Sequence, residues 1–499
     1  MVSDSTFAIH DAGWNWDNTY ARLPEALHSR VSPTSVERPH WIVWNRPLAM
    51  ALGLDAEILS QNQAAPFFAG NALFPGSEPI AQAYAGHQFG NFTRLGDGRA
   101  ILLGEHLDPA GRRWDIQLKG SGPTPYSRRG DGRAGLAPML REYLISEAMH
   151  ALGIPTTRSL AVVTTGEPVF RETPQHGAVL TRVASSHLRV GTLELFAALG
   201  DVESLRLLCR YALDRHYPES STHSNPGLAL LEGVLKRQAH LVAEWMRVGF
   251  VHGVLNTDNV ALSGETIDYG PCAFIDAYDP STVFSSIDHH GRYAFGKQPG
   301  ITSWNLARLA EALLPLIDPD PDTAVQLAQE VLETFPHQFR QAWLTTFRNK
   351  LGLGNEESED LALIEDLLAW MKESQADYTT TFRNLHPELE TPPLHVGSVT
   401  PETTTAWGAW HSRWVQRLNR QASPVDEVLR RMRSRNPSLL PRNHRVEAAL
   451  NAAALHQDLG PFQELVRRLQ NPYSDTDPSD PLGQPPAPGT PRCQTFCGT

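Results

Sequence analysis

The segment that decides the fold is Gly249-Phe250-Val251-His252-Gly253-Val254-Leu255-Asn256-Thr257-Asp258-Asn259, with Ile267-Asp268-Tyr269-Gly270 shortly after it. A strong amphipathic helix pattern precedes the first motif. Protein kinases carry a His, a catalytic Asp and a metal-binding Asn in such a loop, followed by Asp-Phe-Gly. His252 and Asn259 keep the kinase spacing, and the second motif stands where Asp-Phe-Gly would be. The pattern predicts a kinase-like catalytic loop.

One residue of the kinase pattern is missing, because Val254 stands where the catalytic Asp belongs. However, Asp258 directly precedes Asn259 and supplies another carboxylate. Asn259 and Asp268 offer the oxygen ligands that Mg²⁺ or Mn²⁺ prefers. The alternative is a solvated loop that is merely rich in Asn and Asp.

Upstream residues suggest an ATP clamp. Gly96 and Gly98 lie in a turn between two expected strands, where a backbone can approach phosphates. Lys119 ends an alternating strand, and Glu142 lies in the helix that follows. Kinases combine a glycine turn, a strand lysine and a helix glutamate in this order. Taken singly, these residues are also compatible with a plain hairpin, a solvated strand end and a surface glutamate.

Two arginines suggest an unusual nucleotide orientation. Arg182 ends the fifth expected strand, where a kinase has its apolar adenine pocket, and Arg189 follows it. A buried guanidinium needs an anion, and arginine forks bind phosphates well. If phosphates occupied that pocket, the nucleotide would lie reversed, with its α-phosphate over the metal site. The alternative is that both arginines form ordinary surface ion pairs. The basic loop 128–133 could fold over a bound polyphosphate, or it could be a plain surface loop.

Composition excludes several classes of protein. The chain has 499 residues and a formal net charge of −12, which argues against a broad nucleic-acid interface. No apolar run reaches the length of a membrane helix, and Met1–Asn18 lacks the features of a signal or transit peptide. We therefore expect a cytoplasmic protein that binds neither nucleic acid nor membrane, and a monomer by default.

The expected fold class is α+β, a protein-kinase-like two-lobed fold with a strand-rich N-lobe and a helical C-lobe. Strands are expected at 92–103 (two, joined by the glycine turn), 114–119, 160–164, 178–183 and 260–262, and helices at 138–152, 228–248, 303–372 and 402–470. The expected parts are an N-terminal extension (1–65), the N-lobe (66–188), the C-lobe (189–390), a helical C-terminal region (391–470) and a Pro-rich tail with terminal cysteines (471–499).

Four long motifs resemble the selenoprotein O (SelO, also YdiU) family. They are Ala85-Gly86-His87-Gln88-Phe89-Gly90, Leu118-Lys119-Gly120-Ser121-Gly122-Pro123-Thr124, Ser127-Arg128-Arg129-Gly130-Asp131-Gly132-Arg133 and Gly253-Val254-Leu255-Asn256-Thr257-Asp258-Asn259. The resemblance is close over residues 10–310 and includes the tail. It implies a pseudokinase that binds ATP in a flipped orientation and transfers AMP to Ser, Thr or Tyr hydroxyls of protein substrates. Redox proteins are among the expected substrates.

The resemblance also implies roles for single residues. Asp258 would be the proton acceptor, Asn259 and Asp268 would hold Mg²⁺ or Mn²⁺, and Glu142 would pair with Lys119. The residues implied to bind the nucleotide are Gly96, Gly98, Arg99, Lys119, Asp131, Gly132, Arg182, Arg189 and Asp268.

The tail cysteine is a further family feature, because eukaryotic members often carry selenocysteine third from the C-terminus, where this chain has Cys497. Cys272 follows the second metal motif. We expect a regulatory Cys272–Cys497 disulfide, transient in a reducing cytosol. Both thiols remaining free is the alternative, and Cys493 is a competitor.

Three functions remain open at the level of sequence. Transfer of AMP from ATP is favoured by Asp258 and the arginine pair. Uridylyl transfer from UTP with Mn²⁺, associated with bacterial family members, is a variant of it. Ordinary γ-phosphoryl transfer and a silent ATP-binding pseudokinase are the other possibilities, and Val254 favours the silent protein over the phosphotransferase.

Overall fold

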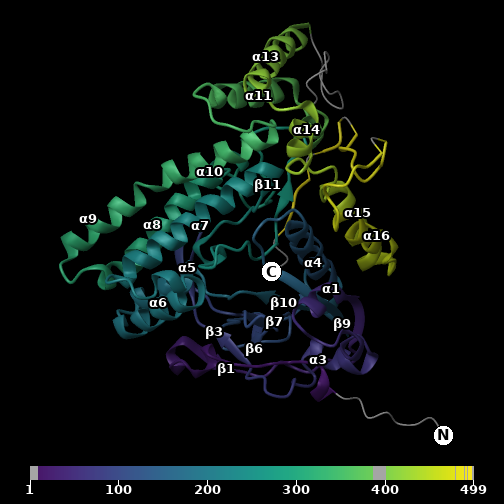
Figure 1. Ribbon diagram of the computed structural model, residues 1–499. Helices are drawn as coiled ribbons and strands as arrows, with labels where there is room; N and C mark the ends of the chain where they lie inside the picture. The colour runs from purple at the N-terminus through teal and green to yellow at the C-terminus, as the bar shows by residue number, and fades with distance from the viewer. Residues whose placement is uncertain (1–8, 386–400, 478, 488, 492, 497–499) are drawn as a thin grey trace.

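The computed structural model describes residues 9–385, 401–477, 479–487, 489–491 and 493–496. The N-terminal region is rich in strands and the C-terminal region is helical, as the purple-to-yellow course of the chain shows (Figure 1). The predicted α+β architecture, with strands first and helices after, is confirmed at this level. Within those ranges no helix is both long and apolar enough to cross a membrane.

One antiparallel sheet organises the N-terminal region. Its strand order in the described residues is β1-β3-β6-β7-β10-β9-β2, and β8 adds to β10. The strands are β1 (His28–Arg30), β2 (His40–Trp44), β3 (Ile80–Gln82), β6 (Ala100–Leu107), β7 (Arg113–Lys119), β8 (Ala134–Gly135), β9 (Arg158–Phe170) and β10 (Pro174–Ala184). The three strands predicted at 114–119, 160–164 and 178–183 correspond to β7, β9 and β10.

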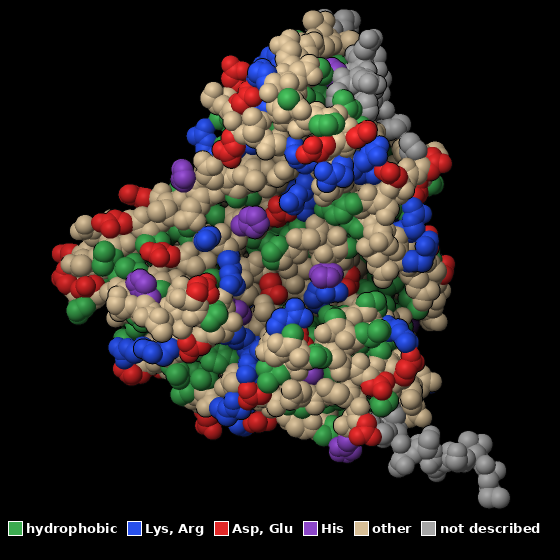
Figure 2. Space-filling view, viewed as in Figure 1, with side chains coloured by type: hydrophobic (Ala, Val, Ile, Leu, Met, Phe, Trp, Pro, Cys, Tyr) green, Lys and Arg blue, Asp and Glu red, His purple; other side chains and the backbone are tan. Residues whose placement is uncertain are grey.

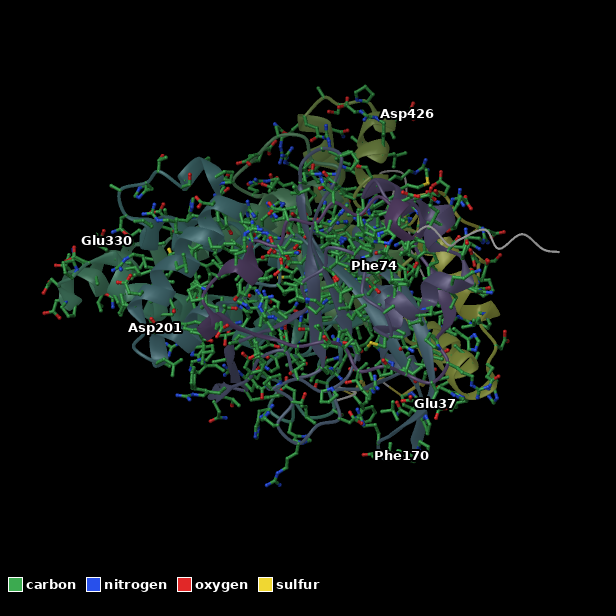
Figure 3. The ribbon with its side chains drawn as sticks, turned by 90° about the horizontal axis from the view of Figure 1, so that it is seen from below. Glu37, Phe74, Phe170, Asp201, Glu330 and Asp426 are labelled. Carbon is green, nitrogen blue, oxygen red and sulfur yellow. The ribbon has the colours of Figure 1, made fainter. Side chains whose placement is uncertain are left out.

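Helices cover both faces of this sheet because strand side chains alternate between them. Val162 and Leu180 join the core that contains α4 (Leu136–Ala151), whereas Val163 and Val179 join the core that contains α3 (Ala65–Ala69). Phe74 belongs to the α3 core and lies inside the molecule, whereas Phe170 points outward from the far end of β9 (Figure 3). The helix predicted at 138–152 is α4.

The helical region is built around α7 (Pro226–Val248), which is capped at its start by the Asn225 side chain and ends at the left-handed Gly249. The other helices are α1 (Arg46–Ala51), α2 (Ala56–Leu59), α5 (Val190–Ala198), α6 (Val202–His216), α8 (Gln298–Ile317), α9 (Pro321–Leu332), α10 (Phe335–Lys350), α11 (Asp360–Ser374), α12 (Tyr378–Asn384), α13 (Pro401–Arg420), α14 (Val425–Arg433), α15 (Asn443–His456) and α16 (Gly460–Leu469). The helices predicted in 228–248, 303–372 and 402–470 are present.

Two short strand pairs lie outside the main sheet: β4 (Ala85–Gln88) with β5 (Asn91–Arg94), and β11 (Phe250–Val251) with β12 (Ala273–Phe274). The two strands predicted within 92–103 are present as β5 and β6, with the glycine turn between them. β5 pairs with β4, whereas β6 pairs with β3 and β7, so the Gly96–Gly98 turn joins two sheets and is not a hairpin.

The strand predicted at 260–262 is reduced to a single bridge between Ala261 and Arg189. The N-terminal extension contributes more than packing, because β1 and β2 form opposite edges of the main sheet. The division of the chain into the five parts given above remains a prediction.

Candidate active site

Lys119 and Glu142 form a buried ion pair between the sheet and α4. The Lys119 ammonium, at the end of β7, donates to Glu142 Oε2 at 2.6 Å. The same nitrogen donates to Asp268 Oδ1 at 2.6 Å. Because Lys119 and Glu142 are both buried, neither is the solvated strand end or surface glutamate that the sequence left open.

Arg182 and Arg189 converge on the same carboxylate. Arg182 Nη1 donates to Asp268 Oδ1 at 2.6 Å, and Arg189 Nη1 donates to Asp268 Oδ2 at 2.9 Å. The two arginines are 1% and 3% exposed, which excludes ordinary surface pairs. Arg189 Nη1 also donates to the backbone oxygen of Asp258 at 2.8 Å. Three buried cations therefore meet at one carboxylate.

Asp268 is held in this position by its charge and by its backbone. Although burial opposes the charged form, Lys119, Arg182 and Arg189 hold the pKa of Asp268 well below its usual range. Its φ of 63° lies in the left-handed region, which a non-glycine residue seldom adopts. Such strained positions are concentrated at functional sites.

Asp258 lies in a short 3₁₀ turn, Thr257–Asn259, which faces the cations. Burial raises the pKa of Asp258 to about 6, and Oδ1 of its carboxylate is buried without a hydrogen-bond partner. The Asn259 side-chain nitrogen donates to the Val254 backbone oxygen at 2.8 Å, which fixes the orientation of the amide. His252 is fully buried and bonds through Nε2 to the Ile267 backbone oxygen, so it supports the loop from behind.

The glycine turn packs directly against residues 124–127, which lead into the basic loop. A Cβ on Gly96, whose φ is 108°, would overlap with the Tyr126 ring, so only glycine fits against this loop. Thr124 Oγ1 donates to the Asp97 backbone oxygen at 2.6 Å. Asp131 is bound by the Arg171 guanidinium through two hydrogen bonds of 2.9 and 3.0 Å.

One cavity of about 340 Å³ joins these groups. The predicted proton acceptor Asp258 lines it, and so does every residue predicted to bind nucleotide or metal, namely Gly96, Gly98, Arg99, Lys119, Asp131, Gly132, Arg182, Arg189, Asn259 and Asp268. In the space-filling view, Lys and Arg side chains surround a hollow in the middle of the molecule, between the strand-rich and helical parts (Figure 2).

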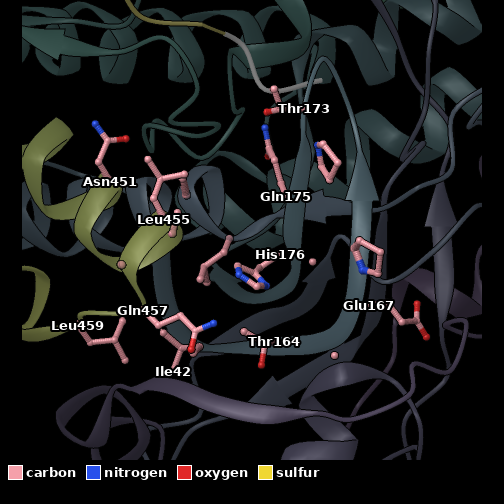
Figure 4. A pocket seen from close by; sticks show the side chains of 18 residues that line it. Ile42, Thr164, Glu167, Thr173, Gln175, His176, Asn451, Leu455, Gln457 and Leu459 are labelled. Atoms are coloured by element: carbon pink, nitrogen blue, oxygen red, sulfur yellow. The ribbon is translucent and has the colours of Figure 1, made fainter.

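A larger cavity of about 930 Å³ lies elsewhere, between β9–β10 and α15. Its lining includes Thr164, Gln175, His176, Asn451 and Leu455 (Figure 4). None of the predicted site residues lines it. The chemistry predicted from the sequence therefore belongs to the smaller cavity.

Comparison with known proteins identifies the family. A family model described as protein adenylyltransferase SelO matches residues 12–470. The chain belongs to the SelO family. Relatives named protein nucleotidyltransferase YdiU are similar along their whole length. The relative from Alkaliphilus metalliredigens is 54% identical, and the alignment covers 99% of each chain. The relative from Syntrophotalea carbinolica is 55% identical over 98% of each chain, and the one from Nitrosococcus oceani is 54% identical over 100% of each chain.

Membership of the SelO family confirms the resemblance given by the motifs. It also confirms that the chain is an enzyme of the nucleotidyltransferase class. The roles of the individual site residues remain predictions, which the geometry now allows us to argue.

Several residues of this SelO-family site were missed from the sequence. The Tyr84 ring lies under the Arg189 guanidinium at 4.6 Å, and Gln117 Oε1 accepts from Arg182 Nη2 at 2.6 Å. Asp97 is buried beside Arg189, and burial raises its pKa to about 6. A signal existed for one of them. Asp115, Gln117 and Lys119 are polar at every second position of β7, so they share one face of the strand, whereas Trp114, Ile116 and Leu118 lie on the other.

The predicted disulfide cannot be described, because Cys497 lies outside the described residues. Cys272 is fully buried, and burial raises the pKa of its thiol to about 12. In the described part of the chain, Cys209, Cys272 and Cys493 are free thiols. The tail does reach this region, since Thr495 Oγ1 donates to the Pro271 backbone oxygen at 2.6 Å. The Cys272–Cys497 bond remains a prediction.

Proposed function

We propose that this member of the SelO family is a protein adenylyltransferase that binds ATP in a flipped orientation within a kinase-like, two-lobed site. The observation that supports it best is the convergence of Lys119, Arg182 and Arg189 on Asp268. In a kinase the end of the fifth strand is part of an apolar adenine pocket. Two buried guanidinium groups there favour a triphosphate over a nucleobase.

The residues present fit a divalent cation that arrives with the nucleotide. Among the described residues there is no group of three or more His, Cys, Asp or Glu side chains that could bind a metal by itself. Asn259 and Asp268 nevertheless provide an amide and a carboxylate, and Mg²⁺ is commonly bound by one or two such groups together with substrate phosphates. When bound, the ion would neutralise charge on the phosphate oxygens.

The chain's own residues account for the other steps. Lys119, Arg182 and Arg189 would bind the β- and γ-phosphates and leave the α-phosphorus facing Asp258. Asp258 would take the proton of a Ser, Thr or Tyr hydroxyl, whose oxygen then bonds to the α-phosphorus. The bond between the α-phosphorus and its bridging oxygen breaks, and pyrophosphate leaves. The products are a protein-bound AMP ester and pyrophosphate.

ATP labelled at either end tests this proposal. The protein is incubated with a Ser- and Thr-rich unfolded acceptor such as casein and with ATP carrying ³²P at the α or the γ position. Protein label from α alone supports adenylyl transfer, γ alone would mean phosphoryl transfer, and neither would mean a silent nucleotide-binding protein. Label from α-labelled UTP in place of ATP would replace adenylyl with uridylyl transfer.

The Asp258→Asn substitution tests the assignment of the base. Asparagine keeps the shape of the side chain but does not accept the proton, so transfer should fall by roughly 10²- to 10⁴-fold while ATP binding persists. Unchanged transfer by this variant would show that Asp258 is not the base.

A further inference from the structure

The hairpin β4–β5 contains the motif Ala85–Gly90, to which nothing above assigns a role. It is separate from the main sheet. Its strand β4 lies against the Thr257–Asn259 turn and against the start of α5. The hairpin therefore touches the loop that carries the proposed base.

Two hydrogen bonds from backbone amides of the hairpin to side chains attach it to this loop. The His87 amide donates to Thr257 Oγ1 at 2.7 Å, and the Phe89 amide donates to Asn256 Oδ1 at 3.1 Å. The Tyr293 hydroxyl donates to the same Asn256 oxygen. The two residues that directly precede Asp258 are thus fixed by the hairpin.

Two glycines allow the segments to approach Asp258. A Cβ on Gly86 would overlap with Asp258 Oδ1, so the carboxylate packs directly against the β4 backbone. A Cβ on Gly191, in the first turn of α5, would overlap with the Ala85 backbone oxygen and would lie 3.5 Å from Asp258 Cα. Asp258 is therefore enclosed by β4 on one side and by α5 on the other.

Gln88 adds a polar side chain from the same strand. This side chain favours the charged form of Asp258 and so opposes the burial that raises the pKa of the carboxyl group. Gln88 also lines the nucleotide cavity beside Asp258 and Asn259. Gln88 thus lies beside the Asp258 carboxylate, on the strand that encloses it.

We propose that the β4–β5 hairpin holds the Asp258 carboxylate in position for the transfer, with Gly86 and Gln88 as positioning residues. This inference rests on the proposed function and names the residues that make its base effective. A small misplacement of a catalytic group costs far more in rate than in substrate binding. The hairpin should therefore affect turnover and leave nucleotide affinity alone.

The test compares Gly86→Ala and Gln88→Ala with Gly300→Ala. Gly300, in the first turn of α8, has open space around its Cα and ordinary helical geometry, so it is a matched control. Transfer of label from α-labelled ATP to casein is measured as kcat and KM, and the melting temperature is recorded. We expect kcat to fall about 100-fold in Gly86→Ala and about 10-fold in Gln88→Ala. KM for ATP should stay within about twofold of the wild type.

The inference would be overturned if both variants kept wild-type kcat, or if KM rose as much as kcat fell. If Gly86→Ala proves too unstable to assay, Gln88→Ala still decides, because it only shortens a side chain. A wild-type protein that transfers no α-label contradicts the proposed function itself. A wild type that is active together with equally active variants contradicts only the role of the hairpin.

Discussion

Asp268 is the residue at which the charges of the site meet. Its two carboxylate oxygens accept from Lys119, Arg182 and Arg189, and Lys119 and Arg182 are shared with Glu142. Breaking a buried ion cluster is costly unless each charge finds a new partner. A nucleotide with its divalent ion offers such partners, since its phosphates suit the three cations and its metal suits Asp268.

The Arg182→Met substitution distinguishes the two nucleotide orientations. If Arg182 binds the terminal phosphates, the variant should lose affinity for ATP by roughly 10- to 100-fold, which corresponds to the free energy of one charge-assisted hydrogen bond. Its affinity for AMP, which has no terminal phosphates, should change little. Calorimetric titration with both nucleotides measures the difference.

Arg22→Met serves as the control, because Arg22 forms an exposed ion pair with Asp17 away from the site. It should bind both nucleotides as the wild type does. Equal losses of ATP and AMP affinity in Arg182→Met would indicate that the arginine contacts the nucleoside.

The sequence predicted some residues of the site and missed others. Asp258, Asn259 and Asp268 lie in motifs whose spacing is itself informative. Tyr84 and Asp97 were missed because their roles depend on burial beside Arg189, and burial is decided by segments distant in the chain. The structure thus adds the residues that orient the arginines.

Strand β7 supplies the polar side chains beneath the arginines. Gln117 is fully buried, and its side-chain oxygen accepts from Arg182 Nε at 3.2 Å and Nη2 at 2.6 Å. The amide also donates to Asp97 at 3.3 Å. One side chain of the strand therefore connects an arginine of the site with a buried carboxylate.

The Gln117→Leu substitution should lower the free energy of unfolding by roughly 1–3 kcal/mol, because it leaves buried polar groups unpaired. Urea denaturation without nucleotide measures this change. Gln326→Leu, at an exposed position of α9, should change stability by less than about 0.5 kcal/mol. A Gln117→Leu protein as stable as the wild type would show that Arg182 finds another acceptor.

At the scale of elements, the sequence predicted helices and strands better than their partners. The apolar periodicity of α7 and the alternation of β7 are local, so they could be seen directly. The pairing of β5 with β4, and of β6 with β3 and β7, depends on long-range contacts. The Gly96–Gly98 turn and its two flanking strands could therefore be predicted, but the two sheets that the turn joins could not.

At the scale of the whole molecule, buried neutral histidines link folding to pH. His216 lies in the core next to Arg215 and Arg237, with Asp115 as the opposing charge, and it bonds to Ser186 Oγ at 2.7 Å. Burial and the two arginines lower its pKa from 6.5 to about 3. Because the unfolded chain binds this proton more readily, the stabilisation is present above pH 6.5 and is lost as the pH falls toward 3.

Between pH 7 and pH 5 this one residue should reduce the free energy of unfolding by on the order of 2 kcal/mol. Urea denaturation at the two pH values should therefore show a smaller loss in His216→Phe than in the wild type. His456→Phe, at the exposed end of α15, should follow the wild type. Equal losses in His216→Phe and the wild type would contradict a neutral buried imidazole.

The orientation of the nucleotide is tested most directly by a crystal structure of the Asp258→Ala variant with Mg²⁺ and a non-hydrolysable ATP analogue. We predict that the terminal phosphate lies within hydrogen-bonding distance of Arg182 and Arg189, and that the α-phosphorus faces position 258. A nucleobase beside Arg182 and Arg189, with the γ-phosphorus in place of the α-phosphorus facing position 258, would contradict the proposed transfer.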